Sequence, residues 1–515
     1  MVDQTNFESK TSDFLAWFKA QSGTTFHNDI EIQDLRSKGA GRGIVAKAEI
    51  PAETVLFTIP RQSIICTNTS GLVSKIPDVF NPAVEGHSDT EDHDCDHDHD
   101  HDHDHHHDHY DHDCEHDHHD DDTSQDSWTS LILILIYEYL QGTNSTWKPY
   151  LDVLPTIDQF GTPMFWTPDE LAELQASPVA SKVGKDEAEE MIRTKILPVI
   201  KQHEDVFFPA TTPQRLSEDE LVQLAFRMGS VIMAYAFDLE KDEDADKDQD
   251  EEDEEDEWVE DREGKTMLGM VPMADILNAD AAFNAHIEHG EHALTATSLR
   301  PIAAGEEILN YYGPLSNGEL LRRYGYTTPT HRRWNLADLA WESVLAGLKS
   351  ELPLKEKEWE KVLGLLDEDD ELEEGFVIER EADDPDSEGR VNEVRKKADV
   401  PEELLEQLKT VMKVVKKVRP DAVPDKTVRD KVMYSAIAKA LDERTRQYGT
   451  TLEQDLELYA AGSSGNKDRR MMALDVRLGE KVLLGQASES VKTKLAELAE
   501  ADRGGDKPSA KRRKM

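Results

Sequence analysis

Cysteine is scarce in this chain of 515 residues, which contains only Cys66, Cys95 and Cys114. Three thiols cannot form the framework of disulfides that stabilises small secreted domains. No secretory leader is expected at the N-terminus. The longest apolar run, residues 131–136, is far too short to span a bilayer. We therefore expect a protein of a reducing intracellular compartment, without a membrane segment and long enough for two or three domains.

Positive charge is missing from two tracts that carry much of the net charge of −50. Residues 85–126 contain 19 acidic residues and no Lys or Arg, and residues 238–263 contain 18 acidic and three basic residues. Apolar side chains are too few in either tract to form a core, so we expect disordered acidic insertions at 85–126 and 240–263. Neither tract offers a basic surface, and direct binding of DNA or RNA is not expected.

Histidine is concentrated in the first of these tracts, where 14 of the 20 histidines lie between His87 and His119, mostly alternating with Asp. Imidazole and carboxylate groups bind zinc, nickel or copper. A defined site, however, needs fixed geometry and supporting contacts that a flexible repeat does not offer. We expect adventitious metal affinity and no metal site. The second tract could steer basic proteins by long-range attraction or only keep the chain soluble, and both interpretations stay open.

A glycine-rich turn lies between two short strands near the N-terminus. The strands are expected at residues 30–32 and 44–46, and Gly39, Gly41 and Gly43 occupy every second position between them. Glycines at such positions let the backbone approach a bound molecule closely, although a plain hairpin would have the same composition. No helix pattern follows, which excludes the dinucleotide fingerprint and the P-loop. A helix is expected over residues 9–21 and a further strand over 54–59.

Residues 269–326 contain two segments whose composition indicates chemistry. Residues 273–278 are a short apolar run that ends in the amide side chain of Asn278, and the turn GEEI at 305–308 leads to Tyr311, Tyr312 and Gly313. A strand with alternating threonines is expected over residues 294–299. Each segment alone would fit core packing followed by a turn. Their order and spacing are the informative feature.

Taken together, the G-x-G-x-G turn, the Asn278 segment, the GEEI turn and the closing Tyr312 resemble the SET domain. That is the fold of most protein-lysine methyltransferases that use S-adenosylmethionine. The string WKPYLDVLP at 147–155 is similar to a segment of one branch, typified by the plant Rubisco large-subunit lysine methyltransferase and including SETD6-like enzymes. Within that branch, residues 271–280 and 319–326 look closest to the fungal ribosomal-protein lysine methyltransferase 4 type, which monomethylates a large-subunit ribosomal protein.

The resemblance implies an α+β fold, with a β-rich SET domain split by a helical insertion and followed by an all-α substrate-binding domain. The implied divisions are an N-terminal helix at 1–24, the SET domain at 25–313 with its insertion at about 128–261, the helical domain at 330–490 and a basic tail at 500–515. Helices are expected at 128–140, 191–197, 218–239, 334–348, 355–366, 401–418 and 426–447. We expect a monomer. The basic cluster at 511–514 is compatible with nuclear import, so the nucleus is the expected location, with the cytoplasm also open.

The resemblance also implies roles for individual residues. Tyr312 is the expected catalytic phenol, and the residues expected to bind S-adenosylmethionine are Lys38, Gly39, Ala40, Gly41, Arg42, Asn278, Ala279, Tyr312 and Tyr324. The attacking amine must be neutral although lysine titrates near ~10.4, so an apolar channel that desolvates the ammonium helps to remove its proton. Alignment of nitrogen, methyl and sulfur supplies most of the remaining rate enhancement. Core packing is the alternative role for Tyr324, and a capping function is the alternative for Asn278.

One residue departs from the family pattern, because Ala279 stands where a His usually follows the Asn. Alanine suffices if that position acts through its backbone, whereas activity is lost if a His side chain is required. The chain also lacks the cysteine clusters of many histone-directed SET enzymes. The expected function is therefore lysine methylation of a basic non-histone protein, first of all a large-subunit ribosomal protein. The alternatives are methylation of histones or of another residue such as histidine, and an inactive SET scaffold that acts as an acidic adaptor.

Overall fold

The computed structural model describes residues 2–80, 120–209, 215–240, 266–366, 372–394, 396–423, 425–462 and 468–505. The chain divides into two compact units. The first comprises Met1–Arg61, Asp152–Ala188 and Pro272–Met515, and the second comprises Gln62–Leu151 and Glu189–Val271. The histidine tract at 87–119, most of both acidic tracts and the basic cluster at 511–514 lie outside the described residues. The expectations for these segments therefore stay predictions.

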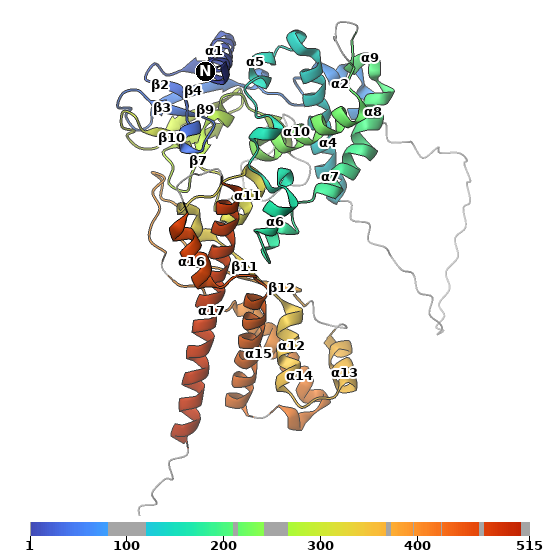
Figure 1. The fold of residues 1–515 in the computed structure, drawn as a ribbon, viewed down its shortest axis with the longest axis vertical. Coiled ribbons are helices and arrows are strands. Elements are labelled where there is room, and N and C mark those ends of the chain that lie inside the picture. The colour runs from blue at the N-terminus through green and yellow to red at the C-terminus, as the bar shows by residue number, and fades with distance from the viewer. Residues whose placement is uncertain are drawn as a thin grey trace, which may run out of the picture. The chain divides into compact units, whose positions relative to one another are not determined.

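Two four-stranded sheets form the β-rich part of the first unit (Figure 1). One has the strand order β1-β4-β9-β8 and the other the order β2-β3-β10-β7. The bounds are β1 (Thr25–Phe26), β2 (Ile30–Asp34), β3 (Arg42–Ala46), β4 (Val55–Pro60), β7 (Asn278–Ala279), β8 (Ala285–His289), β9 (Ala293–Ser298) and β10 (Glu307–Asn310). The strands predicted at 30–32, 44–46, 54–59 and 294–299 are confirmed as β2, β3, β4 and β9.

Strand β10 brings together segments that lie far apart in the sequence. It pairs antiparallel with β3, where Ile308 faces Ile44, and parallel with β7, where Leu309 faces Asn278. The glycine-rich turn before β3 and the amide on β7 therefore meet at one sheet. Ile44 and Ile308 are fully buried beneath them, so the sheet that carries the site rests on a closed core.

The helices of the first unit lie before the sheets, within residues 152–188 and after residue 316. They are α1 (Val2–Ala20), α6 (Pro168–Ala172), α11 (Asn317–Tyr324), α12 (Trp341–Glu351), α13 (Glu356–Leu366), α14 (Glu402–Val418), α15 (Lys426–Arg446), α16 (Leu452–Ala461) and α17 (Arg469–Gly505). The helices predicted at 9–21, 355–366, 401–418 and 426–447 are confirmed. The helices from α12 onward enclose a core of their own that includes Trp359, Leu408, Ile437 and Leu484. The expected fold class, a β-rich domain followed by a helical region, is confirmed.

The helix predicted at 334–348 is wrong in its first part, because Ala337–Ala340 form strand β11 and α12 begins only at Trp341. Strand β11 pairs antiparallel with β12 (Gly375–Ile378). Ala337 and Leu339 are buried while Ala340 is exposed, which is the alternation of a half-buried strand. A short apolar run fits both the helical and the strand period. This run forms a strand because it pairs with β12, some 40 residues later in the chain.

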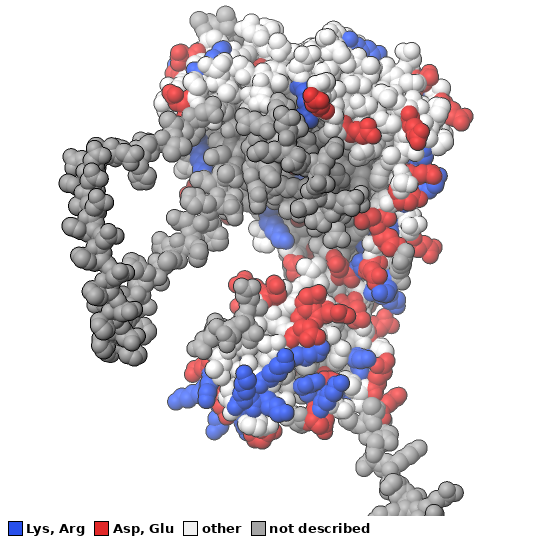
Figure 2. Space-filling view, turned by 180° about the vertical axis from the view of Figure 1, so that it is seen from behind, with Lys and Arg blue, Asp and Glu red and all other residues white. Residues whose placement is uncertain are grey.

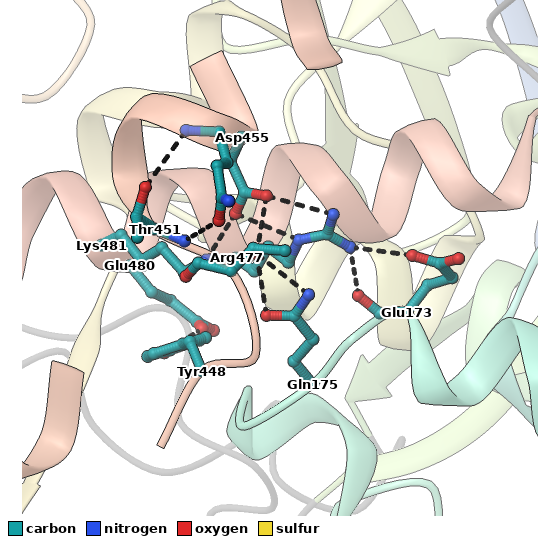
Figure 3. A network of polar contacts seen from close by, with 10 residues as sticks. Glu173, Gln175, Tyr448, Thr451, Asp455, Arg477, Glu480 and Lys481 are labelled. Atoms are coloured by element: carbon teal, nitrogen blue, oxygen red, sulfur yellow. Dashed lines mark hydrogen bonds and ion pairs between the residues drawn. The ribbon is translucent and has the colours of Figure 1, made fainter. Parts of the chain in front are cut away.

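A buried polar network connects α16 and α17 to residues 173–177 (Figure 3). Asp455 on α16 is fully buried and pairs with Arg477 at 3.2 Å and with Lys481 at 2.5 Å. Arg477 also reaches Glu173. Alongside, the Glu480 carboxylate accepts hydrogen bonds from the hydroxyls of Ser177 and Tyr448. These charges hold the N-terminal half of α17 in place.

The second unit is mainly helical. Its helices are α2 (Gly71–Lys75), α3 (Pro77–Phe80), α4 (Asp120–Gln141), α5 (Lys148–Leu151), α8 (Leu197–Gln202), α9 (Glu204–Phe207) and α10 (Glu218–Tyr235), with α7 (Lys185–Met191) at the boundary and a two-stranded sheet of β5 (Ala236–Glu240) and β6 (Thr266–Met270). Residues 131–136 of α4 are almost fully buried. None of the described helices is long and apolar enough to cross a membrane.

Three boundaries in the second unit differ from the sequence predictions. The helix predicted at 128–140 begins earlier, at Asp120, so residues 120–126 are helical rather than disordered; acidic residues favour a helix N-terminus. The helix predicted at 218–239 ends at Tyr235, and the next five residues form β5, which pairs with β6. The helix predicted at 191–197 is a π-helical turn, Ile192–Ile196, between α7 and α8.

Candidate active site

The turn between β2 and β3 is closed by its own backbone. The Leu35 N–H donates to the Gly41 carbonyl at 2.9 Å, and the N–H groups of Lys38 and Ala40 both donate to the Leu35 carbonyl. Gly39 adopts φ +84°, the left-handed region that favours glycine, and its N–H donates to Arg36. The N–H groups of these predicted cofactor residues are therefore used inside the turn. The Lys38 side chain lies exposed.

Gly41 and Gly43 differ in what surrounds them. Gly41 is exposed, and a β-carbon there would meet nothing within 4 Å. Gly43 is buried, and a β-carbon there would stand 2.9 Å from Asn278 Nδ2 and 2.8 Å from Glu307 Oε1. Glycine at 43 thus allows the amide and the carboxylate to approach the strand, while Gly41 presents open backbone beside them.

The Arg42 side chain is turned toward α1. Its guanidinium lies 4.0 Å from the centre of the Phe7 ring, and its Nε donates to Thr11 Oγ1 at 2.9 Å. Nη1 donates to the Val153 carbonyl at 3.0 Å. Burial, and the nearby Arg36 guanidinium, lower the pKa of Arg42 to about 10. The part of Arg42 that lies at the site is its backbone carbonyl, not its charge.

Asn278 is fixed through its amide nitrogen. Nδ2 donates to Glu307 Oε1 at 2.7 Å and to the Arg42 carbonyl at 3.2 Å. These two acceptors fix which end of the amide is nitrogen. The other end, Oδ1, accepts no hydrogen bond from any residue that the structure describes. Asn278 therefore presents an oriented acceptor, held beside Arg42, the residue that follows Gly41.

Three tyrosines gather on the other side of residues 277–279. Tyr312 stacks on Tyr324 with ring centres 4.7 Å apart and planes 22° apart, and Tyr326 lies 6.3 Å from Tyr324. The Tyr312 hydroxyl donates to the Leu277 carbonyl at 3.2 Å. Burial raises the pKa of Tyr324, so this phenol keeps its proton. The site thus has an aromatic wall, and the hydroxyls of Tyr312 and Tyr326 are both directed at the backbone of residues 277–279.

The end of α11 positions Tyr324 and Tyr326. The helix terminates at Gly325, which has φ +77° and whose N–H donates to Leu320 and Leu321. A β-carbon at Gly325 would stand 2.6 Å from the carbonyl carbon of Gly161. The RYGY sequence therefore needs its glycine for both the helix cap and a close backbone contact.

Ala279 takes part through its backbone. It is 8% exposed, it pairs with Asn310 of β10, and its carbonyl accepts the Tyr326 hydroxyl at 3.2 Å. Next to it, Asp280 Oδ1 accepts the Thr330 hydroxyl at 2.6 Å. The contacts of position 279 in the structure are therefore made by its backbone, and whether alanine suffices for cofactor binding stays a prediction.

Two contributors were not predicted from the sequence, Glu307 and Tyr326. Both lie in stretches that the sequence singled out, GEEI and RYGY, but the patterns did not show which side chain faces Asn278 or Ala279. A third, Asn284, is buried and fixes β10 by accepting the Leu309 N–H and donating to the Glu307 carbonyl. No signal in its surrounding sequence indicated this. Within the described residues, no group of three His, Cys, Asp or Glu is placed to hold a metal ion.

Two small sheets bring together a glycine turn, an oriented amide and stacked tyrosines ahead of a helical region, which is the arrangement expected of the SET class of folds. The SET domain model matches residues 41–313, and the chain belongs to this family. Residues 394–484, which lie in the helical region, match the Rubisco LSMT substrate-binding family.

Individual relatives agree with this assignment. The chain is 28% identical to ribosomal lysine N-methyltransferase 4 of Saccharomyces cerevisiae over 346 residues, which cover 67% of this chain and 60% of that protein. It is 31% identical to N-lysine methyltransferase SETD6 of Bos taurus, covering 71% and 78% of the two chains. A crystal structure of the SET domain of LSMT bound to lysine and AdoHcy superimposes with a TM-score of 0.59 at 17% identity, over 96% of this chain and 93% of that one.

Proposed function

We propose that this protein is an S-adenosylmethionine-dependent protein-lysine N-methyltransferase that acts on a basic non-histone protein, in the first place a large-subunit ribosomal protein. The observation that carries the proposal is that Asn278 contacts the Arg42 carbonyl, next to the open Gly41, while Tyr312 contacts the carbonyl of the adjoining Leu277. The ribosomal substrate, and a single methyl group as the product, rest on the similarity to the yeast ribosomal enzyme.

The residues present fit S-adenosylmethionine. Its amino-acid end carries an ammonium donor, and the oriented Oδ1 of Asn278 is an acceptor of the matching kind. The exposed Gly41 leaves room for a ligand to lie against the backbone. When bound, the cofactor supplies a methyl group on a positively charged sulfur. We assign its binding to Asn278, Gly41, Tyr312 and Tyr324, with backbone roles for Ala279 and Arg42 and for residues 38–40 through carbonyl groups.

The chain's own side chains prepare the amine. We assign to Tyr312 the positioning of the incoming lysine nitrogen, since its hydroxyl is already held by the Leu277 carbonyl. The stacked faces of Tyr312 and Tyr324 tolerate a cation before the lysine loses its proton. Apolar surroundings then favour the neutral amine that can attack. Orientation contributes most of the rate enhancement, so no strong general base is needed.

The charge on the helical region limits where a basic substrate can dock. Figure 2 shows Lys and Arg side chains gathered on part of the C-terminal helical region. Helix α14 of this region carries Lys409, Lys413, Lys416 and Lys417, of which the last three are exposed. Only Lys409 pairs within the helix, with Glu406. This face repels a basic protein. We therefore place the docking of a basic substrate on another face of the region.

The experiment that tests the proposal combines the purified chain and methyl-labelled S-adenosylmethionine with two substrate pools, stripped ribosomal proteins and core histones. A single labelled ribosomal band whose label lies on lysine is the expected result. Label only in histones, or on histidine, would keep the enzyme and replace the substrate. Absence of label from both pools, with no cofactor binding, would leave the acidic adaptor as the function.

The domain divisions, the monomeric state, the nuclear location and the lack of nucleic-acid binding stay proposals of the same kind. The nuclear location rests on the basic cluster at 511–514. Imaging of the full chain with and without that cluster tests it. Retention in the cytoplasm only after removal of the cluster is the expected result.

A further inference from the structure

The first unit contains a cavity, and one of its lining residues, Thr330, donates its hydroxyl to Asp280 next to Ala279. This cavity of about 530 Å³ is lined by residues that follow α11, by Arg380 and by the segment before α14. Its lining side chains are Pro329, Thr330, Arg332, Arg333, Arg380, Asn392, Glu393, Val394, Lys396 and Lys397. Five of these ten are basic and one is acidic, in a chain whose net charge is −50. The volume lies in the range of small-molecule sites.

Three of the five cations have carboxylate partners. Arg332 pairs with Asp475 at 2.6 Å, Lys396 pairs with Glu381, and Lys397 lies 3.5 Å from Glu489. Both lysines are more than two-thirds exposed, so water and salt screen their pairs. These three residues alone would not make a site for a ligand.

Arg333 and Arg380 are different, because neither pairs with a carboxylate among the residues that the structure describes. Arg333 is 6% exposed, and its Nη2 donates to the Asp383 carbonyl, while its Nε is buried without a hydrogen-bond partner among those residues. Arg380 donates to Gln486 Oε1 and to the Arg332 carbonyl, both neutral acceptors. Burial lowers the pKa of Arg380. Arg333 is buried and Arg380 is partly buried. A buried guanidinium without a counter-charge is costly, and an anion in the cavity would offset that cost.

We propose that this cavity binds a phosphorylated small molecule, with the phosphate held by the guanidinium groups of Arg333 and Arg380. The planar fork of arginine matches phosphate oxygens in pairs, which single ammonium groups cannot do. Lys396 and Lys397 at the exposed edge add attraction, and the side chains of Pro329 and Val394 offer apolar surface for the organic part. The site is separate from the methyl-transfer proposal and does not depend on it.

The test is calorimetric titration of the full chain with pyrophosphate and with inorganic phosphate, at matched ionic strength in chloride. Saturable binding of pyrophosphate is expected. Arg380→Gln and Arg333→Gln should each weaken it by about tenfold or more, because each removes a paired contact. The matched control is Arg446→Gln, which removes the same charge from an exposed pair with Asp442 and should leave the dissociation constant unchanged within about twofold.

Further arms separate the sources of the phosphate and guard against misfolding. Phosphoserine replaces pyrophosphate in one titration; tighter binding of phosphoserine would move the ligand to a phosphorylated protein. If either arginine variant loses its cooperative thermal transition, the double variant Lys396→Gln/Lys397→Gln is titrated in its place. This double variant must still bind pyrophosphate more weakly than the wild type. No saturable heat up to about 10 mM pyrophosphate, or equal affinity in Arg380→Gln, would overturn the proposal.

Discussion

Leu277 and Ala279 offer backbone carbonyls to the site, and Asn278 between them offers its side chain. The carbonyls of Leu277 and Ala279 receive the hydroxyls of Tyr312 and Tyr326, while the Asn278 side chain turns to the glycine turn and Glu307. Backbone carbonyls and a side chain leave an extended segment in different directions, so the tyrosines and the glycine turn can contact the same three residues.

Replacement of Tyr312 by phenylalanine should lower kcat by roughly 10²-fold, because the hydroxyl that orients the amine is lost. The affinity of the variant for S-adenosylmethionine should change little, since the aromatic ring and its stacking on Tyr324 remain. The measurement is single-turnover methyl transfer with a fixed substrate. Tyr326→Phe is the matched control: it loses the same kind of bond to a carbonyl and should keep most of the rate. Equal rates for Tyr312→Phe and the wild type would remove Tyr312 from the chemistry.

The sequence was sufficient to single out Asn278 and Tyr312, which the structure brings to adjacent positions of one segment, because the order of short motifs is itself a pattern. It was not sufficient to find the partners that fix them. Glu307 and Tyr326 stand in the same motifs, yet their function depends on side-chain direction across β7 and β10, which no spacing encodes. For the same reason, the sequence did not show that the Arg42 guanidinium contacts Phe7 and Thr11 of α1.

At the scale of elements, the attachment of α16 and α17 rests on buried charge. Burial alone would raise the pKa of Asp455. Hydrogen bonds from Arg477 and Lys481 outweigh burial and lower this pKa. Asp455→Asn would leave two buried cations with one partner fewer. A loss of about 3–5 kcal/mol in unfolding free energy is expected, measured by chemical denaturation. The exposed Asp442→Asn, which breaks a surface pair with Arg446, should cost less than about 1 kcal/mol. Similar losses for both would refute the structural role of the network.

Glu480 should make stability depend on pH. Burial raises its pKa to about 7, above its ordinary value of 4.5, although the hydroxyls of Ser177 and Tyr448 act in the opposite direction. The folded state therefore holds this proton more tightly than the unfolded state. The stability it contributes is full below about pH 4.5 and is lost as pH rises to about 7.

Glu480→Gln should remove this dependence. The unfolding free energy of the variant, relative to the wild type, should rise by roughly 2–3 kcal/mol between pH 5 and 8. Denaturation curves of both proteins across that pH range measure the difference in unfolding free energy. The contributions of other titrating groups are the same in both proteins and cancel in this difference. A difference that stays constant with pH would show that Glu480 is ionised in the folded protein throughout.

Helices whose apolar residues recur with helical spacing over several turns were predicted well. Strands that form because they pair with a segment far along the chain were not. Helices α14 and α15 follow their apolar spacing almost to the residue. Strands β5 and β11 were predicted as helix, because their short apolar runs pair with segments far along the chain. Helix α17 was not predicted because its N-terminal half is buried on all sides and carries Asp475, Arg477, Glu480 and Lys481, which a polarity pattern assigns to solvent.

At the scale of the whole molecule, charge is divided between an acidic chain and the basic face of α14. Lys413→Gln/Lys416→Gln/Lys417→Gln should leave KM for a basic substrate unchanged or lower it, because repulsion is removed. Initial rates at low and high salt measure this, and the difference should vanish at high salt. A KM that rises severalfold at low salt would place the docking of the substrate on this face.

The most direct test of the account is calorimetric titration of the full chain with S-adenosylmethionine, for the wild type and for Asn278→Ala. The wild type should bind one equivalent, and the variant should bind at least about tenfold more weakly, because the oriented amide oxygen is lost. Equal affinity in the two proteins would place the cofactor elsewhere. No saturable binding to the wild type would contradict the assignment of this site to methyl transfer.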